Sequence, residues 1–262
     1  MSNYFNPETR CVLVAASRSG STFLQTALSN HTEIGCDRYE PLAAGSPYLT
    51  YLVPPSDEWS LCHALLARPG YKATVIKLSY RQFRNHGARR FLQGIGATHI
   101  IHLTRDNPLR IVFSAFVNTH VPGTPSLAYT ASVSPDRVTI PTVVFIEQCD
   151  RYLENVAAMR DELTTCRLPL LTLTYEMITY DALSPAVNTN RVVHATAMTI
   201  CTFLRVIDEG LFGITVRQHP GPLSLYIENW SEVSGALQVT PYAHYLEKEL
   251  NYETEWNARA NP

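Results

Sequence analysis

Two features of secreted and metal-binding proteins are missing from this sequence: paired cysteines and a long apolar segment. Its six cysteines lie far apart, and none has the Cys-x-x-Cys spacing of zinc and redox sites. Several fall within apolar strand or helix patterns, so we expect reduced, buried thiols. No apolar run is long enough for a transmembrane helix, and the polar residues 1–7 do not resemble a signal peptide. These absences predict a soluble, cytoplasmic protein.

The chain also has little net charge. Its 262 residues include 21 Lys and Arg and 23 Asp and Glu, which gives a formal net charge of −2. This balance offers no electrostatic reason to expect nucleic acid or an anionic membrane as a partner, so any basic site must be local. The sequence has no internal repeat and no low-complexity tract. Its length and its 45% hydrophobic content suit one large α/β domain or two small ones.

Apolar strand patterns alternate with helical patterns, which favours a parallel sheet covered on both faces. We expect strands at Cys11–Ala16, Glu33–Cys36, Thr74–Leu78, His99–Thr104 and Leu170–Thr174. We expect helices at Thr22–Asn30, Asp57–Ala67, Arg81–Leu92, Leu109–Asn118, Val143–Glu162 and Arg191–Arg205. In such sheets ligands bind beyond the carboxyl ends of the strands. Ser17, Glu40, Ser79 and Arg105 are therefore expected around one crevice.

A small-residue loop with one arginine follows the first expected strand, at Ser17–Thr22 (SRSGST). A strand–loop–helix of this kind directs backbone N–H groups and the positive end of the helix dipole toward one point, where a phosphate-like anion binds. We expect Ser21 and Thr22 to cap the helix and Arg18 to add positive charge. A Walker A loop needs Gly-x-x-x-x-Gly-Lys-Ser/Thr, whereas here Ala15 stands at the first glycine and Ser21 at the lysine. The loop therefore fits a phosphate-like group but lacks the lysine of an ATPase.

The same loop resembles the 5′-phosphosulfate loop of sulfotransferases that use 3′-phosphoadenosine 5′-phosphosulfate (PAPS). Three further segments resemble these enzymes in the same order: a Glu-Pro segment at Tyr39–Leu42, a 3′-phosphate segment at His99–Ser114, and a late basic loop and helix at Val216–Trp230. The resemblance implies a single three-layer α/β domain over residues 1–262, with a central parallel sheet and the P-loop-like sulfotransferase fold. A Pro-rich insert at 121–141 and a C-terminal helical tail at 240–262 complete this expected domain.

The resemblance also implies an activity. The enzyme would pass the sulfuryl group of PAPS in line to an acceptor hydroxyl, release 3′,5′-bisphosphoadenosine and need no metal. Glu40 would take the proton, and Arg18 would stabilise the leaving oxygen. Lys77 lies in an otherwise apolar strand, so it must be paired or face the crevice, and we include it among the catalytic residues. The implied cofactor ligands are Ser17, Arg18, Ser19, Gly20, Ser21, Thr22, Arg105, Ser114, Arg217 and Gln218.

Several alternatives stay open. His63, His99, His102 and His219 are rivals to Glu40 as the base. The acceptor is a small molecule or glycan: sugar, lipid, peptide and natural-product hydroxyls are all possible, as is an amine. The oligomeric state is open. The insert at 121–141 either shapes the acceptor pocket or is a surface loop. The rival functions are a P-loop small-molecule kinase and a non-catalytic nucleotide-binding or scaffolding protein. The missing lysine argues against the first, and Glu40 beside the loop argues against the second.

Overall fold

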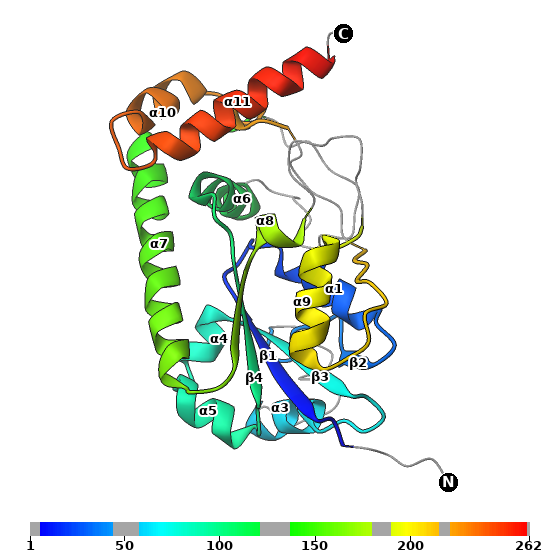
Figure 1. Cartoon of the computed structure of the whole chain (residues 1–262). Coiled ribbons are helices and arrows are strands. Elements are labelled where there is room, and N and C mark those ends of the chain that lie inside the picture. The colour runs from blue at the N-terminus through cyan, green and yellow to red at the C-terminus, as the bar shows by residue number, and fades with distance from the viewer. Residues whose placement is uncertain (1–5, 44–57, 121–136, 180–189, 215–220, 261–262) are drawn as a thin grey trace. The chain divides into compact units, whose positions relative to one another are not determined.

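The computed structural model describes residues 6–43, 58–120, 137–179, 190–214 and 221–260 (Figure 1). The contacts within the chain divide it into two compact units. The first consists of residues 1–104, 156–180 and 189–215, and contains the sheet. The second consists of residues 105–155, 181–188 and 216–262, and its described elements are helical. The expected single domain over residues 1–262 stays a prediction.

A five-stranded, fully parallel sheet forms the centre of the first unit, in the order β2-β3-β1-β4-β5. Its strands are β1 (Thr9–Ala15), β2 (Ile34–Cys36), β3 (Ala73–Ser79), β4 (His99–Thr104) and β5 (Leu170–Thr174). The chain moves from β1 toward one edge of the sheet and from β4 toward the other. The order of the strands therefore reverses between β1 and β4, where open α/β sheets bind their ligands. All five expected strands are present, with small shifts at their ends.

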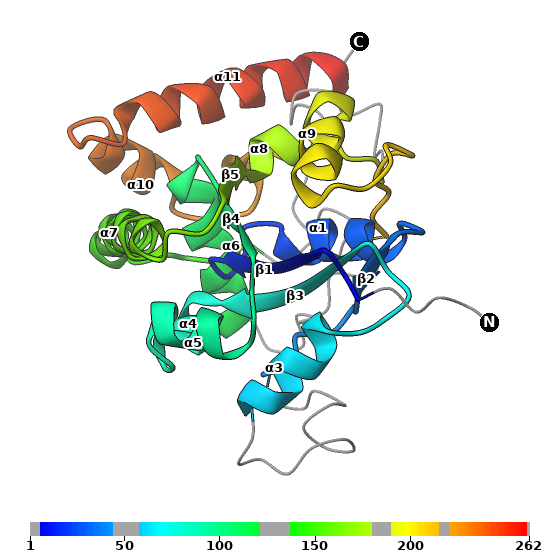
Figure 2. The same cartoon turned by 60° about the horizontal axis from the view of Figure 1, so that its bottom comes forward.

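Helices cover both faces of this sheet (Figure 2). Helices α1 (Ser21–Ser29) and α9 (His194–Leu204) lie on one face. Helices α3 (Glu58–Leu66), α4 (Tyr80–Arg84) and α5 (Ala88–Gly94) lie on the other. A short helix, α8 (Tyr175–Ile178), follows β5 directly. The unit is thus an α/β fold with a central parallel sheet flanked by helices, which confirms the expected fold class.

The prediction of one helix at Arg81–Leu92 is wrong, because two helices occupy this stretch. The first, α4, begins with a capping box in which Ser79 and Gln82 exchange hydrogen bonds. The second, α5, begins after Gly87, whose φ of 71° lies outside the helical region. A residue with a positive φ cannot continue a right-handed helix, so Gly87 separates the two.

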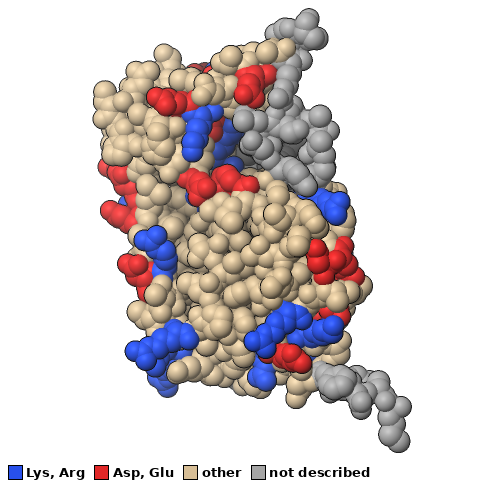
Figure 3. Space-filling view, viewed as in Figure 1, with Lys and Arg blue, Asp and Glu red and all other residues tan. Residues whose placement is uncertain are grey.

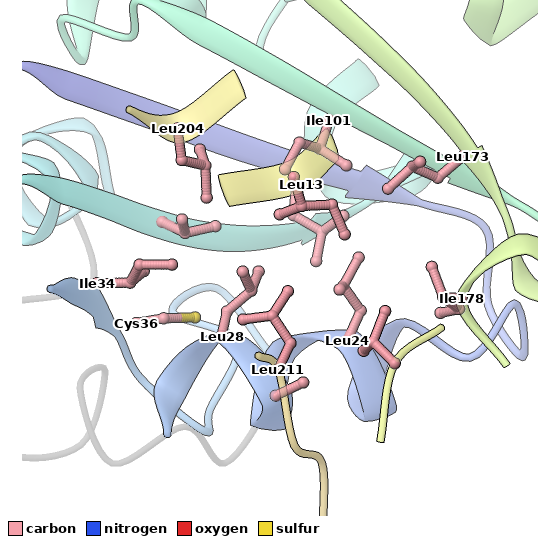
Figure 4. Packing of buried hydrophobic residues seen from close by; sticks show 14 of the residues in the cluster. Leu13, Leu24, Leu28, Ile34, Cys36, Ile101, Leu173, Ile178, Leu204 and Leu211 are labelled. Atoms are coloured by element: carbon pink, nitrogen blue, oxygen red, sulfur yellow. The ribbon is translucent and has the colours of Figure 1, made fainter. Parts of the chain in front are cut away.

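The main hydrophobic core lies between the sheet and the helices α1 and α9. Leu13, Ile101 and Leu173 come from three adjacent strands and point toward Leu24 and Leu28 of α1 (Figure 4). All five side chains are fully buried. Burying a leucine or isoleucine in this way contributes about 1.5–3 kcal/mol, so this layer holds α1 firmly against the strand that precedes it.

The second unit is built from α6 (Pro108–His120), the first part of α7 (Thr142–Thr165), the 3-10 turn η1 (Leu223–Leu225), α10 (Trp230–Leu237) and α11 (Ala243–Ala260). A buried ion pair joins α6 to α11: Arg110 donates two hydrogen bonds of 2.6 Å to the Glu249 carboxylate. Arg110 also donates to the carbonyl oxygen of Gly221. Arg110 is therefore an internal anchor of this unit rather than a solvated helix charge.

All six cysteines are buried and free, as the sequence predicted. They are Cys11, Cys36, Cys62, Cys149, Cys166 and Cys201. Within the described ranges, none of the helices has both the length and the apolarity to cross a membrane.

Candidate active site

The loop between β1 and α1 is fixed by its own backbone. Arg18 has a φ of 65° and Gly20 a φ of 80°, both in the left-handed region. The buried Ser19 hydroxyl donates a hydrogen bond of 2.7 Å to the carbonyl oxygen of Ala16. A left-handed arginine is strained backbone of the kind that clusters at ligand sites.

Helix α1 begins differently from the prediction. Its N-cap is Gly20, which has no side chain to cap the helix, so the expectation that Ser21 and Thr22 would cap it is wrong. Both residues lie inside the first turn, because the left-handed Gly20 already ends the loop one residue earlier. A first turn without a side-chain cap is suited to binding an anion through its N–H groups.

Tyr175 packs directly on this loop from the end of β5. A Cβ atom added at Gly20 would lie 2.7 Å from Tyr175 Cε2, and closer still to Cδ2. Only glycine fits here, because both the positive φ and the tyrosine ring exclude a side chain. The shape of the loop is therefore set by Tyr175, which follows the edge strand β5.

The structure brings three candidate residues together, which we call the Lys77 cluster: Thr22 of α1, Glu40 after β2, and Lys77 of β3. Lys77 Nζ lies 2.8 Å from Glu40 Oε1 and donates a hydrogen bond of 3.3 Å to Thr22 Oγ1. The Lys77 side chain is only 5% exposed, whereas that of Glu40 is 27% exposed. An ammonium group is thus held beside the first turn of α1, and its carboxylate partner can be reached from outside.

Glu40 lies between an exposed residue and a buried segment. Pro41 and Leu42 are buried and fix the segment that carries the carboxylate. Tyr39, on the other side of Glu40, is 59% exposed. Arg18 is partly buried, and this burial lowers the pKa of its guanidinium below the usual value.

The strand histidines lie in structural positions. His102 is buried, its Nε2 lies 2.6 Å from the Tyr80 hydroxyl, and burial lowers its pKa to about 4. The pKa of His99 is also lowered, mainly by burial. His63 is exposed on α3, and His219 lies outside the described residues. The Lys77 cluster therefore contains Glu40 and none of the described histidines.

Arg105 and Ser114 belong to the second unit. Arg105 directly follows β4, and its backbone is fixed by Tyr152: the N–H donates to the Tyr152 hydroxyl at 2.9 Å, and the carbonyl accepts from it at 2.7 Å. Ser114 is partly buried on α6. Asn107 accepts hydrogen bonds from the first N–H groups of this helix and donates to Glu249.

Some predicted residues cannot be placed. Arg217 and Gln218 lie outside the described residues, as does the insert up to residue 136. Of the insert, residues 137–141 are described: Ile140 is buried, and its backbone exchanges hydrogen bonds with the Asn229 side chain.

Sequence reasoning missed two residues with structural contacts in this unit: Tyr152, which holds the backbone of the candidate ligand Arg105, and Glu249, which pairs with Arg110. Tyr152 lies 47 positions from Arg105, and Glu249 lies 139 positions from Arg110. No sequence pattern connects residues so far apart, since the contacts arise only from the packing of α6 against α7 and α11.

Charge is not gathered into a broad patch on the face drawn in Figure 3, where Lys and Arg alternate with Asp and Glu. Across the described ranges, no group of three or more His, Cys, Asp and Glu side chains is placed to hold a metal ion.

No family model and no curated protein matches the chain. Among solved structures, the crystal structure of a sulfotransferase from Alicyclobacillus acidocaldarius is similar, with a TM-score of 0.49 and 14% sequence identity over 94% of each chain. A likeness at this level assigns no family to the chain, so its function has to follow from its own residues.

Proposed function

We propose that this protein is a sulfotransferase that moves the sulfuryl group of PAPS to an acceptor hydroxyl. The observation that carries the proposal is the Lys77 cluster. A buried ammonium and a reachable carboxylate meet at the first turn of the helix that follows the phosphate-type loop. Sulfuryl transfer needs this combination, because it requires positive charge at the donor and a base at the acceptor.

The loop binds the 5′-phosphosulfate. The N–H groups at the start of α1 hydrogen-bond to its oxygens, and Arg18 and Lys77 balance its negative charge. Ser17, Ser19, Ser21 and Thr22 complete this set, and Gly20 supplies the positive φ with which the loop turns into α1. The Tyr175 ring packs against the loop at Gly20, so the anion approaches it from elsewhere.

In the transfer step, the acceptor oxygen forms a bond to sulfur while the bond from sulfur to the bridging phosphate oxygen breaks. The bridging oxygen keeps the electron pair and leaves as part of 3′,5′-bisphosphoadenosine. Arg18 and Lys77 stabilise the charge that develops on this oxygen. The acceptor proton passes to the carboxylate of Glu40, which Lys77 orients through the 2.8 Å ion pair.

The 3′-phosphate is assigned to Arg105 and Ser114, and further cofactor contacts to Arg217 and Gln218. This part of the proposal rests on the sequence resemblance. The fixed backbone at Arg105 supports it, because a guanidinium on a rigid segment loses little entropy when it binds a phosphate.

The proposal is tested by calorimetric titration with PAPS, 3′,5′-bisphosphoadenosine and Mg-ATP, together with transfer of ³⁵S from labelled PAPS to a panel of sugars, lipids and phenols. We expect the bisphosphate to bind without divalent metal and labelled product to form from at least one acceptor. Equal affinity for Mg-ATP would favour a small-molecule kinase. Binding without transfer to any acceptor, with donor hydrolysis also absent, would favour a non-catalytic nucleotide-binding protein.

Arg105→Ala provides the specificity arm of this test. Loss of a charge-assisted contact should weaken bisphosphate binding by about 1.5–3 kcal/mol. The affinity for adenosine 5′-phosphosulfate, which lacks the 3′-phosphate, should hardly change in this variant. Equal losses for the two nucleotides would show that Arg105 does not contact the 3′-phosphate.

A further inference from the structure

The Lys77 cluster has a second property, which follows from the place of Thr22 in the loop. When the loop is aligned with a Walker A sequence, Ser21 stands at the lysine and Thr22 at the conserved hydroxyl residue. In P-loop nucleotidases that hydroxyl binds Mg²⁺, and an acidic side chain helps to hold the ion. Here the hydroxyl instead accepts a hydrogen bond from Lys77 Nζ.

The oxygen atoms around this ammonium are those that a magnesium ion would use. Thr22 supplies a hydroxyl at 3.3 Å and Glu40 a carboxylate at 2.8 Å. Hydroxyl and carboxylate oxygens are the ligands that hard divalent cations prefer. The Lys77 side chain is almost fully buried, so its charge is held in this position rather than moving through solvent.

We propose that the ammonium group of Lys77 takes the place that the divalent metal occupies in P-loop nucleotidases, so that the site carries its own cation. The inference rests on the proposed function, because it explains how a phosphosulfate is bound without a metal. A phosphosulfate carries fewer negative charges than a nucleoside triphosphate, and a monovalent ammonium together with Arg18 therefore balances it. The cation is thereby supplied by the neighbouring strand β3 and not by the loop.

A charge-reversing variant tests this assignment. Lys77→Asp replaces the ammonium with a carboxylate that points the same way from β3. A metal ion then fits between Asp, Glu40 and Thr22, because the shorter side chain and one metal–oxygen bond together replace the length of the lysine. Lys77→Met is the matched control, since it removes the charge and keeps the volume. The probe is Mn²⁺ alone, measured by electron paramagnetic resonance and by its effect on Tm.

We expect Lys77→Asp to bind a single Mn²⁺ and to gain thermal stability from it, while the wild type and Lys77→Met do neither. Adding Thr22→Val or Glu40→Gln to Lys77→Asp should weaken Mn²⁺ binding roughly tenfold or more, because the first removes an oxygen ligand and the second replaces a carboxylate with a neutral amide. A folded Lys77→Asp protein that binds no Mn²⁺, or binds it equally after both additions, would overturn the inference. Should Lys77→Asp not fold, Lys77→Ala takes its place, because it removes the charge and also leaves room for the ion: Mn²⁺ binding that both additions weaken would support the inference, and no binding would overturn it.

A nucleotide arm separates this inference from the proposed function. Bisphosphate binding should be independent of Mg²⁺ in the wild type and dependent on it in Lys77→Asp. A wild type that binds no bisphosphate at all would refute the proposed function, and the Mn²⁺ result would still stand. A wild type that binds the bisphosphate only with Mg²⁺ would refute the inference and leave nucleotide binding intact.

Discussion

Gly20→Ala is the substitution whose cost the structure defines most fully. Gly20 is the N-cap of α1 with a φ of 80°, and a Cβ there would lie 2.7 Å from Tyr175 Cε2 and closer to Cδ2. The left-handed backbone costs alanine about 1–2 kcal/mol. Displacing a packed ring adds about 1–3 kcal/mol, as overpacking of a core does. The free energy of unfolding should therefore fall by roughly 2–5 kcal/mol.

Gly87→Ala serves as a control without a clash. Gly87 is also a helix N-cap with a positive φ of 71°, but nothing lies within 4 Å of the Cβ that would be added. Its ψ of 99° differs from the 13° of Gly20 and lies outside the left-handed helical region, so alanine there should cost at least about 1–2 kcal/mol from the backbone alone. Urea denaturation gives the loss of free energy of unfolding for both variants.

A double-mutant cycle with Tyr175→Ala identifies the ring as the cause. The losses from Gly20→Ala and Tyr175→Ala should not add, and the double variant should recover about 1–3 kcal/mol relative to their sum. Additive losses would show that the ring moves freely out of the way. Such additivity would refute the argument that Tyr175 sets the shape of the loop.

Three further predictions follow from single contacts. Glu40→Gln should lower turnover by roughly a hundredfold or more, which steady-state kinetics measures. Bisphosphate affinity, measured by titration, should stay equal or rise, because the Glu40 carboxylate no longer competes with the phosphate for Lys77. Glu249→Gln leaves the Arg110 guanidinium buried without its partner charge, so chemical denaturation should show a loss of about 3–5 kcal/mol, and less after Arg110→Met is added. Burial lowers the pKa of His102 from 6.5 to about 4, so the unfolded chain takes up the proton first as the pH falls. The contribution of His102 to the free energy of unfolding is intact above pH 6.5 and should decline by about 3 kcal/mol toward pH 4. Denaturation measured against pH should show this slope, and His102→Phe should flatten it.

The sheet could be predicted because its strands are continuous apolar runs. All residues of β4 are buried, and in β1 only Arg10 is partly exposed. A strand buried on both faces is a continuous apolar run and does not alternate between apolar and polar residues. Polar residues mark the turns at its ends. The phosphate-type loop was predictable for a different reason, since small residues between a strand and a helix are the pattern in which backbone N–H groups converge on an anion.

Two local predictions failed because the decisive conformation is not encoded in residue type alone. The helix at Arg81–Leu92 has a regular apolar pattern, and only the positive φ of Gly87 divides it. The caps proposed at Ser21 and Thr22 follow a sound preference for hydroxyl residues. Gly20 takes the N-cap instead, in a left-handed conformation against which Tyr175 packs, and a contact between residues so far apart in the chain leaves no local pattern.

The pairing of Lys77 with Glu40 lies between these cases. A lysine in an apolar strand predicts a partner or a crevice for its ammonium group, and the sequence places Glu40 after the neighbouring strand. The ion pair itself forms only when β2 and β3 are in register. Loop shape and loop charge consequently have separate origins: Tyr175 and Gly20 set the shape, whereas Lys77 supplies charge from another strand. Changes at Gly20 should therefore alter stability and anion binding together. Changes at Lys77 that keep its volume should alter anion binding far more than the shape of the loop, because they leave the contact between Tyr175 and Gly20 in place.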